Sequence, residues 1–344
     1  MKAGFRVLDS DLHVIEPSDL YDRYLDPKFR DRTPRPTATR GAYTSQWTVG
    51  DFTFPRPLGR GRVDAEKRAA AVLKDYAAAR FDSASQQRAM DVEGLDVAVL
   101  FRTLPVVCVD AFEPAFASAL CRAWNDWAAD FRRPAPGRMH AAALVTLHDA
   151  TLAAEELSRS VKELGFVAAQ MMPNPVNGVN LHDPKMDPLW SEAERLNVPI
   201  CFHPAPNNYS DTHFVNRYLT APSTTIAGGL NNPVELMAAV ASMTAGGVLA
   251  ASRAYAWRSS RATAAGCRGS CGGSTSTGQW RRAARRRSCR RRPASISGAS
   301  ASSAPIPTRI RSSGSSRSSA TTRSCSRPTT RTRTRISRTR RTSS

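Results

Sequence analysis

The chain lacks the sequence features that mark membrane, secreted and dinucleotide-binding proteins. No apolar run reaches the 18 residues that a membrane span needs. Arg6 and Asp9 stand where a secretory signal would place its apolar stretch. No Gly-x-Gly-x-x-Gly pattern follows the first predicted strand. We therefore expect a cytoplasmic protein with no membrane partner, and the missing glycine pattern disfavours a doubly wound dinucleotide-binding sheet.

Cysteines are few, and their surroundings exclude a disulfide framework. Cys108, Cys121 and Cys201 stand singly among apolar residues, as reduced core thiols do in cytosolic proteins. The other four of the seven cysteines lie after residue 250.

Acidic residues are confined to the first 250 positions, where all 29 of them occur with 26 basic residues. Residues 251–344 contain 23 Arg and no Lys, Asp, Glu or His. The formal charge of +20 therefore belongs to the C-terminal region, and the first 250 residues have a net charge of −3. A nucleic-acid-binding surface is excluded for most of the chain, although the C-terminal region would bind polyanions nonspecifically.

Residues 1–249 alternate between predicted strands and helices, which favours a parallel α/β sheet. After a short strand at Val7 and Leu8, which we expect to be buried, residues 18–85 form a long irregular insertion with a helix at 19–25. Within it, 35–61 is predicted as loop, with Phe52 and Phe54 in a short hairpin. The later predicted strands are 95–103, 139–147, 166–172 and 198–202. Between them we expect a helix over 112–131, one capped by Asp149 and ended by Gly165, one capped by Asp187, and finally one over 233–249 capped by Asn232. This order fits either a barrel or a doubly wound sheet.

Two segments carry side chains that could bind a metal. Asp11 and His13 lie two residues apart, so in an extended chain they point to the same side. A carboxylate and an imidazole together form half of a metal site. His203 directly follows the predicted strand 198–202. The residues alone leave another interpretation open, in which Asp11 caps a turn and backbone groups satisfy both histidines.

The pattern Asp-x-Asp-x-His-x-x-Glu-Pro at 9–17 resembles the first strand of the amidohydrolase-2 group of the amidohydrolase superfamily. That group includes aminocarboxymuconate-semialdehyde decarboxylase and γ-resorcylate decarboxylase. Four later segments resemble it in the same order, namely 95–103, 125–127, 187–190 and 198–204. The resemblance covers residues 5–249. It implies a distorted (β/α)8 TIM barrel, incomplete here with about five βα units.

The same resemblance implies the site and the chemistry. Asp11, His13 and His203 would bind a divalent metal, Zn²⁺ or Mn²⁺, with Glu16 orienting the ligands. We expect a decarboxylase or hydrolase of a small carboxylated or cyclic substrate, and complete family members can be homodimers. No catalytic acid or base is assigned, because the expected Asp of the eighth strand is missing. The alternative is a non-enzymatic partial α/β scaffold with a basic nucleic-acid-binding tail.

Residues 250–344 do not continue the family pattern. They are dominated by Arg, Ser, Thr, Ala and Pro, which predicts either a disordered tail or a reading-frame error. The second explanation can be tested by reading the coding sequence in a shifted frame. Each shifted codon takes the third base of one written codon and the first two bases of the next. In that frame, codons for residues 254–278 can also encode the sequence LRVAFLEGNCGWVPWLLWRLDEHW. Codons for residues 325–332 can encode FSTDYPH. Both strings resemble missing parts of the family, the second being its strand-eight metal motif. We interpret the region as frameshifted.

The frameshift hypothesis predicts that the coding DNA carries a single-base insertion or deletion near codon 250. Correcting that base should yield an open frame that encodes both strings. Resequencing the genomic DNA measures this directly. If no single-base change near codon 250 restores them, the hypothesis is wrong and the Arg-rich region is genuine.

Overall fold

The computed structural model describes residues 4–40, 43–54, 73–103, 109–205, 209–218, 224–251 and 257–259. All of them belong to the first of two units, residues 1–293 and 294–344. Of the predicted tail, 250–344, the structure describes residues 250–251 at the end of a helix and residues 257–259 in a strand; the rest lies outside the described residues. Its proposed frame error remains a prediction.

The described part of the chain contains a parallel sheet in the order β1-β5-β6-β7-β8-β9, in which every neighbouring pair is parallel. Its strands are β1 (Leu8–His13), β5 (Val97–Phe101), β6 (Met139–Leu144), β7 (Ala168–Met171), β8 (Ile200–Phe202) and β9 (Trp257–Ser259). The helices are α1 (Leu20–Tyr24), α3 (Lys74–Ala78), α4 (Ser83–Glu93), α5 (Pro114–Arg132), α6 (Ala150–Lys162), α7 (Asp187–Leu196), α8 (Thr224–Ala245) and α9 (Val248–Ala251), with 3-10 turns η1 (Pro27–Arg32), η2 (Pro184–Met186) and η3 (Phe214–Tyr218). This is the incomplete (β/α)8 barrel that the sequence predicts.

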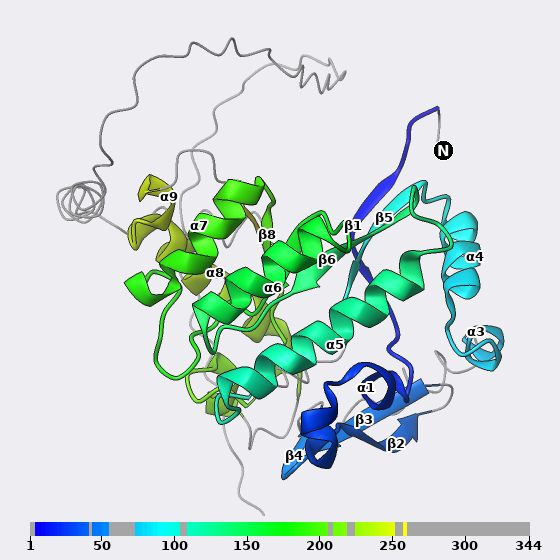
Figure 1. Ribbon diagram of the computed structural model, residues 1–344, viewed down its shortest axis with the longest axis horizontal. Coiled ribbons are helices and arrows are strands. Elements are labelled where there is room, and N and C mark those ends of the chain that lie inside the picture. Colours follow the sequence, from blue (N-terminus) through cyan, green and yellow to red (C-terminus); the bar gives the residue numbers. More distant parts are fainter. Residues whose placement is uncertain are drawn as a thin grey trace, which may run out of the picture. The chain divides into compact units, whose positions relative to one another are not determined.

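The two faces of the sheet have different environments. Leu100, Ala141 and Ile200 belong to the main core, where they pack with the aromatic side of α5. Figure 1 shows α5, α6 and α7 covering one face of the strands. The alternate residues Phe101, Ala142, Ala168 and Cys201 form a separate small cluster on the other face. In a closed barrel that second face would be the interior.

The segment Asn125-Asp-Trp127 fastens α5 to the end of β6. Asn125 is fully buried, and its amide both accepts from the Leu144 N–H (2.8 Å) and donates to the Leu144 carbonyl (3.0 Å). The same amide donates to Glu156 of α6 (2.7 Å), which also pairs with Arg159. A buried asparagine can satisfy a strand end in this way because it carries both a donor and an acceptor. The motif therefore fixes α5 and α6 on β6, in the middle of the parallel sheet.

Residues 35–61 are not simply a loop, as the sequence analysis expected. A three-stranded antiparallel sheet occupies part of this range, formed by β2 (Arg35–Arg40), β3 (Tyr43–Val49) and β4 (Phe52–Phe54). The predicted hairpin at Phe52 and Phe54 is confirmed, since both belong to β4 and pair with β3. Of the missed strands, β3 contains Tyr43, Trp47 and Val49 together with Thr and Ser, a composition typical of strands. Buried Trp47 packs edge-on against Tyr21 of α1.

Helix boundaries were predicted correctly at one cap and wrongly at two. Asp149 caps α6 by accepting the Thr151 and Leu152 amides, and Gly165 has a left-handed φ of +67° beyond its end. Asp187 is not the cap of α7, because η2 precedes it and Asp183 caps that turn instead. Pro233 lies inside α8 rather than at its start, so Asn232 is not a cap.

The apolar stretch Gly229–Ala251 comprises most of α8 and all of α9. In the described part of the chain, it is the one stretch with the length and hydropathy of a membrane span. Its mean hydropathy is 1.6, and 39% of the window is buried. Leu236, Ala239 and Met243 belong to the main core, and buried Glu235 lies on the same helix. These residues pack one side of the stretch against the main core.

Among the described strands, β1 lies at one edge of the parallel sheet, and its start is exposed. Leu8, predicted to be buried, has 59% of its surface exposed, and nearby Phe5 has 76%. In the sheet order β1 has a neighbour on one side, β5. Exposure follows from this position, because a further strand would be needed to cover Leu8. An exposed apolar edge strand promotes association between chains.

We therefore predict that the chain self-associates through β1 and that Leu8→Lys reduces this association. A lysine on an edge strand opposes pairing with another chain by charge repulsion and desolvation. Light scattering after size exclusion should show a shift towards monomer. Val92→Lys is the matched control, because Val92 is 78% exposed on α4 and should leave association unchanged. A monomeric unmodified chain with sharp cooperative unfolding would contradict the prediction.

Candidate metal centre

Three predicted ligand residues meet at the carboxyl ends of β1 and β8. Asp11, His13 and His203 each direct a potential ligand atom into one space, with all three atoms within 4.8 Å of one another. His13 Nε2 and His203 Nε2 are 2.9 Å apart. Asp11 Oδ1 lies 3.6 Å from His203 Nε2 and 3.9 Å from His13 Nε2. The structure brings the three predicted residues together, and their role as metal ligands remains a prediction.

The separations fit a single bound cation. Zinc and similar metals bind nitrogen and oxygen ligands at about 2.0–2.2 Å, so neighbouring ligand atoms on one ion are roughly 3–3.5 Å apart. The two imidazoles and the carboxylate are spaced close to these values. Their mixture of nitrogen and oxygen donors suits Zn²⁺ or Mn²⁺. This residue set can therefore hold a divalent metal.

Curvature of the sheet brings the ligands together. In the strand order, β1 and β8 are separated by four strand spacings, which would be roughly 19 Å in a flat sheet. His13 and His203 nevertheless touch, with ring centroids 4.7 Å apart. Both side chains therefore lie on the concave face, with the small cluster of Phe101, Ala142, Ala168 and Cys201.

Neighbouring residues fix the orientation of the histidines. The Phe101 ring lies 5.8 Å from the His203 ring, and the His203 backbone N–H donates to the Met171 carbonyl (2.8 Å). Thr103 Oγ1 lies 3.5 Å from His13 Nδ1 and donates to the Val14 carbonyl. Each histidine thus contacts residues at a neighbouring strand end, and these contacts restrict its position before a metal binds.

Glu16 is buried, and it contacts the site through Thr103. Its Oε1 accepts from the Thr103 N–H (2.8 Å) and from Trp124 Nε1 (3.2 Å). The Thr103 hydroxyl in turn lies beside His13. Glu16 therefore ties helix α5 to the segment that holds one ligand, and its predicted role in orienting the ligands remains a prediction.

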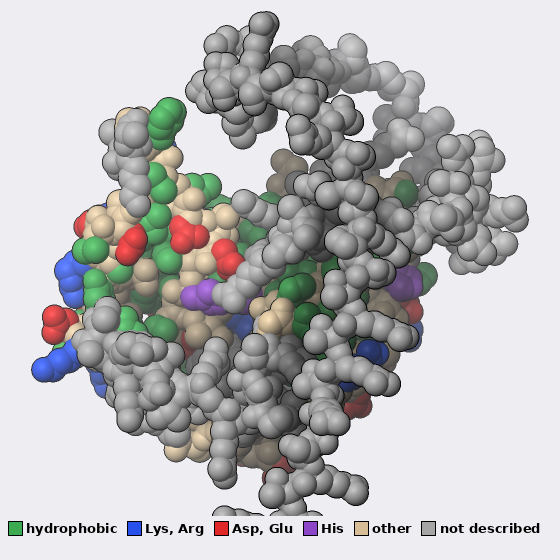
Figure 2. Space-filling model, turned by 180° about the vertical axis from the view of Figure 1, so that it is seen from behind, with side chains coloured by type: hydrophobic (Ala, Val, Ile, Leu, Met, Phe, Trp, Pro, Cys, Tyr) green, Lys and Arg blue, Asp and Glu red, His purple; other side chains and the backbone are tan. Residues whose placement is uncertain are grey.

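The exposure of the three ligands differs. The His203 side chain is 5% exposed, whereas Asp11 and His13 are 25% and 27% exposed. Figure 2 shows histidine and acidic side chains close together on one face of the molecule. The site thus combines one buried ligand with two that solvent or a small molecule can reach.

His148 and Asp110 form a second polar cluster that sequence reasoning did not identify as a pair. His148 Nε2 donates to the Val109 carbonyl (2.7 Å), and its Nδ1 lies 2.6 Å from Thr146 Oγ1. Burial lowers the pKa of His148 and raises the pKa of Asp110, which accepts from Ser210 Oγ (3.1 Å). Since both ring nitrogens are engaged, His148 has the contacts of a structural residue.

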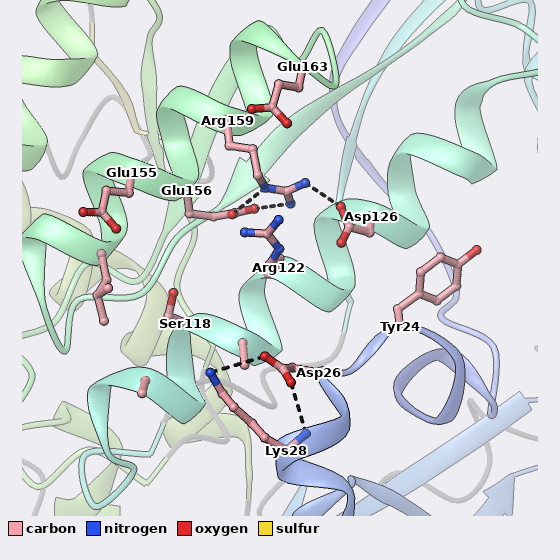
Figure 3. A pocket seen from close by; sticks show the side chains of 13 residues that line it. Tyr24, Asp26, Lys28, Ser118, Arg122, Asp126, Glu155, Glu156, Arg159 and Glu163 are labelled. Atoms are coloured by element: carbon pink, nitrogen blue, oxygen red, sulfur yellow. Dashed lines mark hydrogen bonds and ion pairs between the residues drawn. The ribbon is translucent and has the colours of Figure 1, made fainter.

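A polar groove of about 720 Å³ lies away from the metal cluster, between η1, α5 and α6. Figure 3 shows Arg159 between Glu156 and Asp126, and Lys28 beside Asp26. The carboxylates raise the pKa of Arg159 above its usual value despite burial, which lowers it. These charges neutralise one another within the fold. The groove therefore resembles a solvated helix surface more than a reaction site.

Comparison with known proteins identifies the fold and the family. The chain matches the family described as Amidohydrolase over residues 9–253. A solved amidohydrolase, map2389c from Mycobacterium avium subsp. paratuberculosis K-10, superposes with a TM-score of 0.59 at 23% identity, covering 78% of this chain and 75% of that one. The 5-carboxyvanillate decarboxylase of Novosphingobium aromaticivorans, solved with manganese and 4-hydroxy-3-methoxy-5-nitrobenzoic acid, superposes with a TM-score of 0.50 at 20% identity, covering 75% and 65%.

Curated relatives match a shorter stretch. Decarboxylase orsB of Emericella nidulans is 40% identical over 112 residues, 31% of this chain and 34% of that protein. Gamma-resorcylate decarboxylase of Polaromonas sp. is 33% identical over 127 residues, 34% and 37% of the two chains. The chain thus spans about a third of the length of the curated relatives it matches. Because the family match covers well over half of the sequence, this chain belongs to the amidohydrolase family.

Proposed function

We propose that this protein is built as a metal-dependent decarboxylase of a small carboxylated aromatic or cyclic compound. The observation that carries the proposal is the convergence of Asp11, His13 and His203 on one cation-sized space. The names of the curated relatives, which are decarboxylases, support decarboxylation over hydrolysis. The manganese in the Novosphingobium enzyme supports Mn²⁺, and the ligand set is equally compatible with Zn²⁺.

The described residues would have the following roles. Asp11, His13 and His203 would hold the ion, Phe101 would pack against the His203 ring, and the Met171 carbonyl would hold the His203 backbone. Glu16 and Thr103 would hold the end of β1 in register with β5. A bound divalent cation would supply positive charge that stabilises negative charge developing on substrate oxygens. The concave face would orient the substrate ring.

Protonation of the ring carbon requires an acid that we do not assign among the described residues. We propose that it is encoded in the shifted frame, within FSTDYPH. The family match ends at residue 253, close to where the frames would diverge, which supports this view. Loss of a general acid or base typically lowers a rate by roughly 10²–10⁴. The chain as written should therefore bind metal weakly and show no measurable turnover.

The rest of the proposal concerns partners and location. We propose a cytoplasmic protein that acts on a small molecule, with no specific nucleic-acid partner. A homodimer is the expected assembly of the frame-corrected form. Residues 250–344 would then be a translation of the wrong frame and not a binding domain. The described residues supply a ligand cluster that a non-enzymatic scaffold would not need.

The metal assignment predicts that His203→Ala lowers affinity for Mn²⁺ by roughly 100-fold or more, because loss of a residue that only orients a ligand already costs about 10–100-fold. Titration followed by electron paramagnetic resonance measures free and bound Mn²⁺. His182→Ala is the matched control, since His182 bonds to Ser242 of α8 and should leave affinity unchanged. Equal affinities in the His203→Ala and unmodified chains would refute the assignment.

The same titration on a frame-corrected chain should show tighter metal binding, together with release of CO₂ from a carboxylated aromatic substrate. Detection of hydrolysis products without CO₂ would show that the reaction is hydrolysis and not decarboxylation. Normal turnover by the chain as written would show that its C-terminal region is functional and that no frame error exists.

A further inference from the structure

Strand β1 contains an extra residue relative to the part of β5 that it pairs with. Asp9 pairs with Ala98. The next pair in register is Leu12 with Leu100. Three steps along β1, from 9 to 12, therefore match two steps along β5, from 98 to 100. Such a β-bulge re-aims side chains and is common beside active sites. This bulge includes Asp11, one of the three candidate metal ligands.

The extra residue determines which face of the sheet Asp11 occupies. Without it, the register set by Asp9 would place Asp11 beside Leu100, which belongs to the main core. With it, Asp11 lies opposite Val99, which packs on the small cluster of the concave face. Residues in register on neighbouring strands point to the same face of a sheet, because the pleats align. The bulge therefore moves the Asp11 carboxylate from the core to the face that carries the other two candidate ligands.

The side chain of Asp9 closes the bulge. Its Oδ1 accepts from the backbone N–H of Asp11 at 2.9 Å. Aspartate side chains bond in this way to the backbone two residues further on, and the bond holds the chain in a turn. A bulge disrupts the ladder of backbone hydrogen bonds between strands. Asp9 thus supplies an acceptor to the residue whose own carboxylate is the candidate ligand.

Regular pairing resumes directly after the bulge. His13 pairs with Phe101, and the Val14 N–H donates to the Phe101 carbonyl (3.1 Å). Pairing with β5 therefore fixes the backbone of His13. The backbone of Asp11 lies in the irregular step instead, so its position depends on the hydrogen bond from Asp9.

We propose that Asp9 is a positioning residue, which holds the bulge and thereby aims the Asp11 carboxylate at the metal. This inference rests on the proposed function, because it takes Asp11, His13 and His203 as metal ligands. Asp9 is not a member of the ligand cluster and acts through the Asp11 backbone. The place of its oxygen therefore matters more than its charge.

Manganese affinity of the full chain, measured by electron paramagnetic resonance, tests the proposal with two crossed variants. Asp9→Asn keeps an oxygen acceptor without the charge, and it should lose less than about tenfold in affinity. Asp9→Glu keeps the charge on a longer side chain that misplaces the oxygen. It should lose roughly 10–100-fold, the usual effect of removing an outer partner of a metal ligand. Asp9→Ala should lose as much as Asp9→Glu.

A second measurement needs no metal. Hydrogen exchange of the Asp11 amide, followed by NMR, should quicken roughly tenfold or more in Asp9→Ala, because a hydrogen bond to a charged group is lost. It should stay slow in Asp9→Asn. Asp183→Ala is the matched control, because Asp183 Oδ1 accepts the Lys185 N–H at the same distance, 2.9 Å, at the start of η2. That variant should change neither the Asp11 exchange nor the manganese affinity.

The crossed variants decide the role of Asp9 even if Asp9→Ala does not fold. Unchanged manganese affinity in Asp9→Glu, or unchanged Asp11 exchange in a folded Asp9→Ala, would refute that role and leave the metal centre intact. A large loss in Asp9→Asn with full affinity in Asp9→Glu would also overturn the proposal, because charge and not position would then matter. Failure of the unmodified chain to bind Mn²⁺ would refute the metal centre and, with it, this inference.

Discussion

The contact between His13 and His203 is the constraint on which this account of the structure depends. The two residues are 190 positions apart and lie on strands separated by β5, β6 and β7. Their Nε2 atoms can approach to 2.9 Å only if the sheet curves into part of a barrel. Parallel pairing places the carboxyl ends of all these strands at one edge, where side chains of barrel enzymes meet. The curvature of the parallel sheet therefore produces both the partial barrel and the ligand cluster.

The surrounding residues keep that geometry fixed. Asn125 binds the end of β6 to α5 and α6, while Glu16 binds Thr103 and Trp124 together. Both side chains are buried, so their hydrogen bonds are formed away from competing water. Removing either would leave buried polar groups without partners and would loosen the strand ends. The positions of the ligands thus depend on polar contacts between layers as well as on apolar packing.

Local patterns predicted the alternating strands and helices, whereas the family resemblance implied the barrel and the ligand set, whose metal-binding role remains a prediction. Asp11 and His13 are two residues apart on a strand, and His203 directly follows a buried run. Sequence reasoning failed where neighbours in space decide the outcome. The cap at Asp183 displaced the one expected at Asp187, and packing carried α8 through Pro233.

Anomalous diffraction from crystals grown with Mn²⁺ tests the central claim most directly. The claim is that the curved sheet builds one metal centre from Asp11, His13 and His203. We predict a single strong anomalous peak within bonding distance, about 2.0–2.3 Å, of Asp11 Oδ1 and of Nε2 of both histidines. A peak that misses His203, or a pair of histidines joined by a hydrogen bond with manganese bound elsewhere, would contradict the claim.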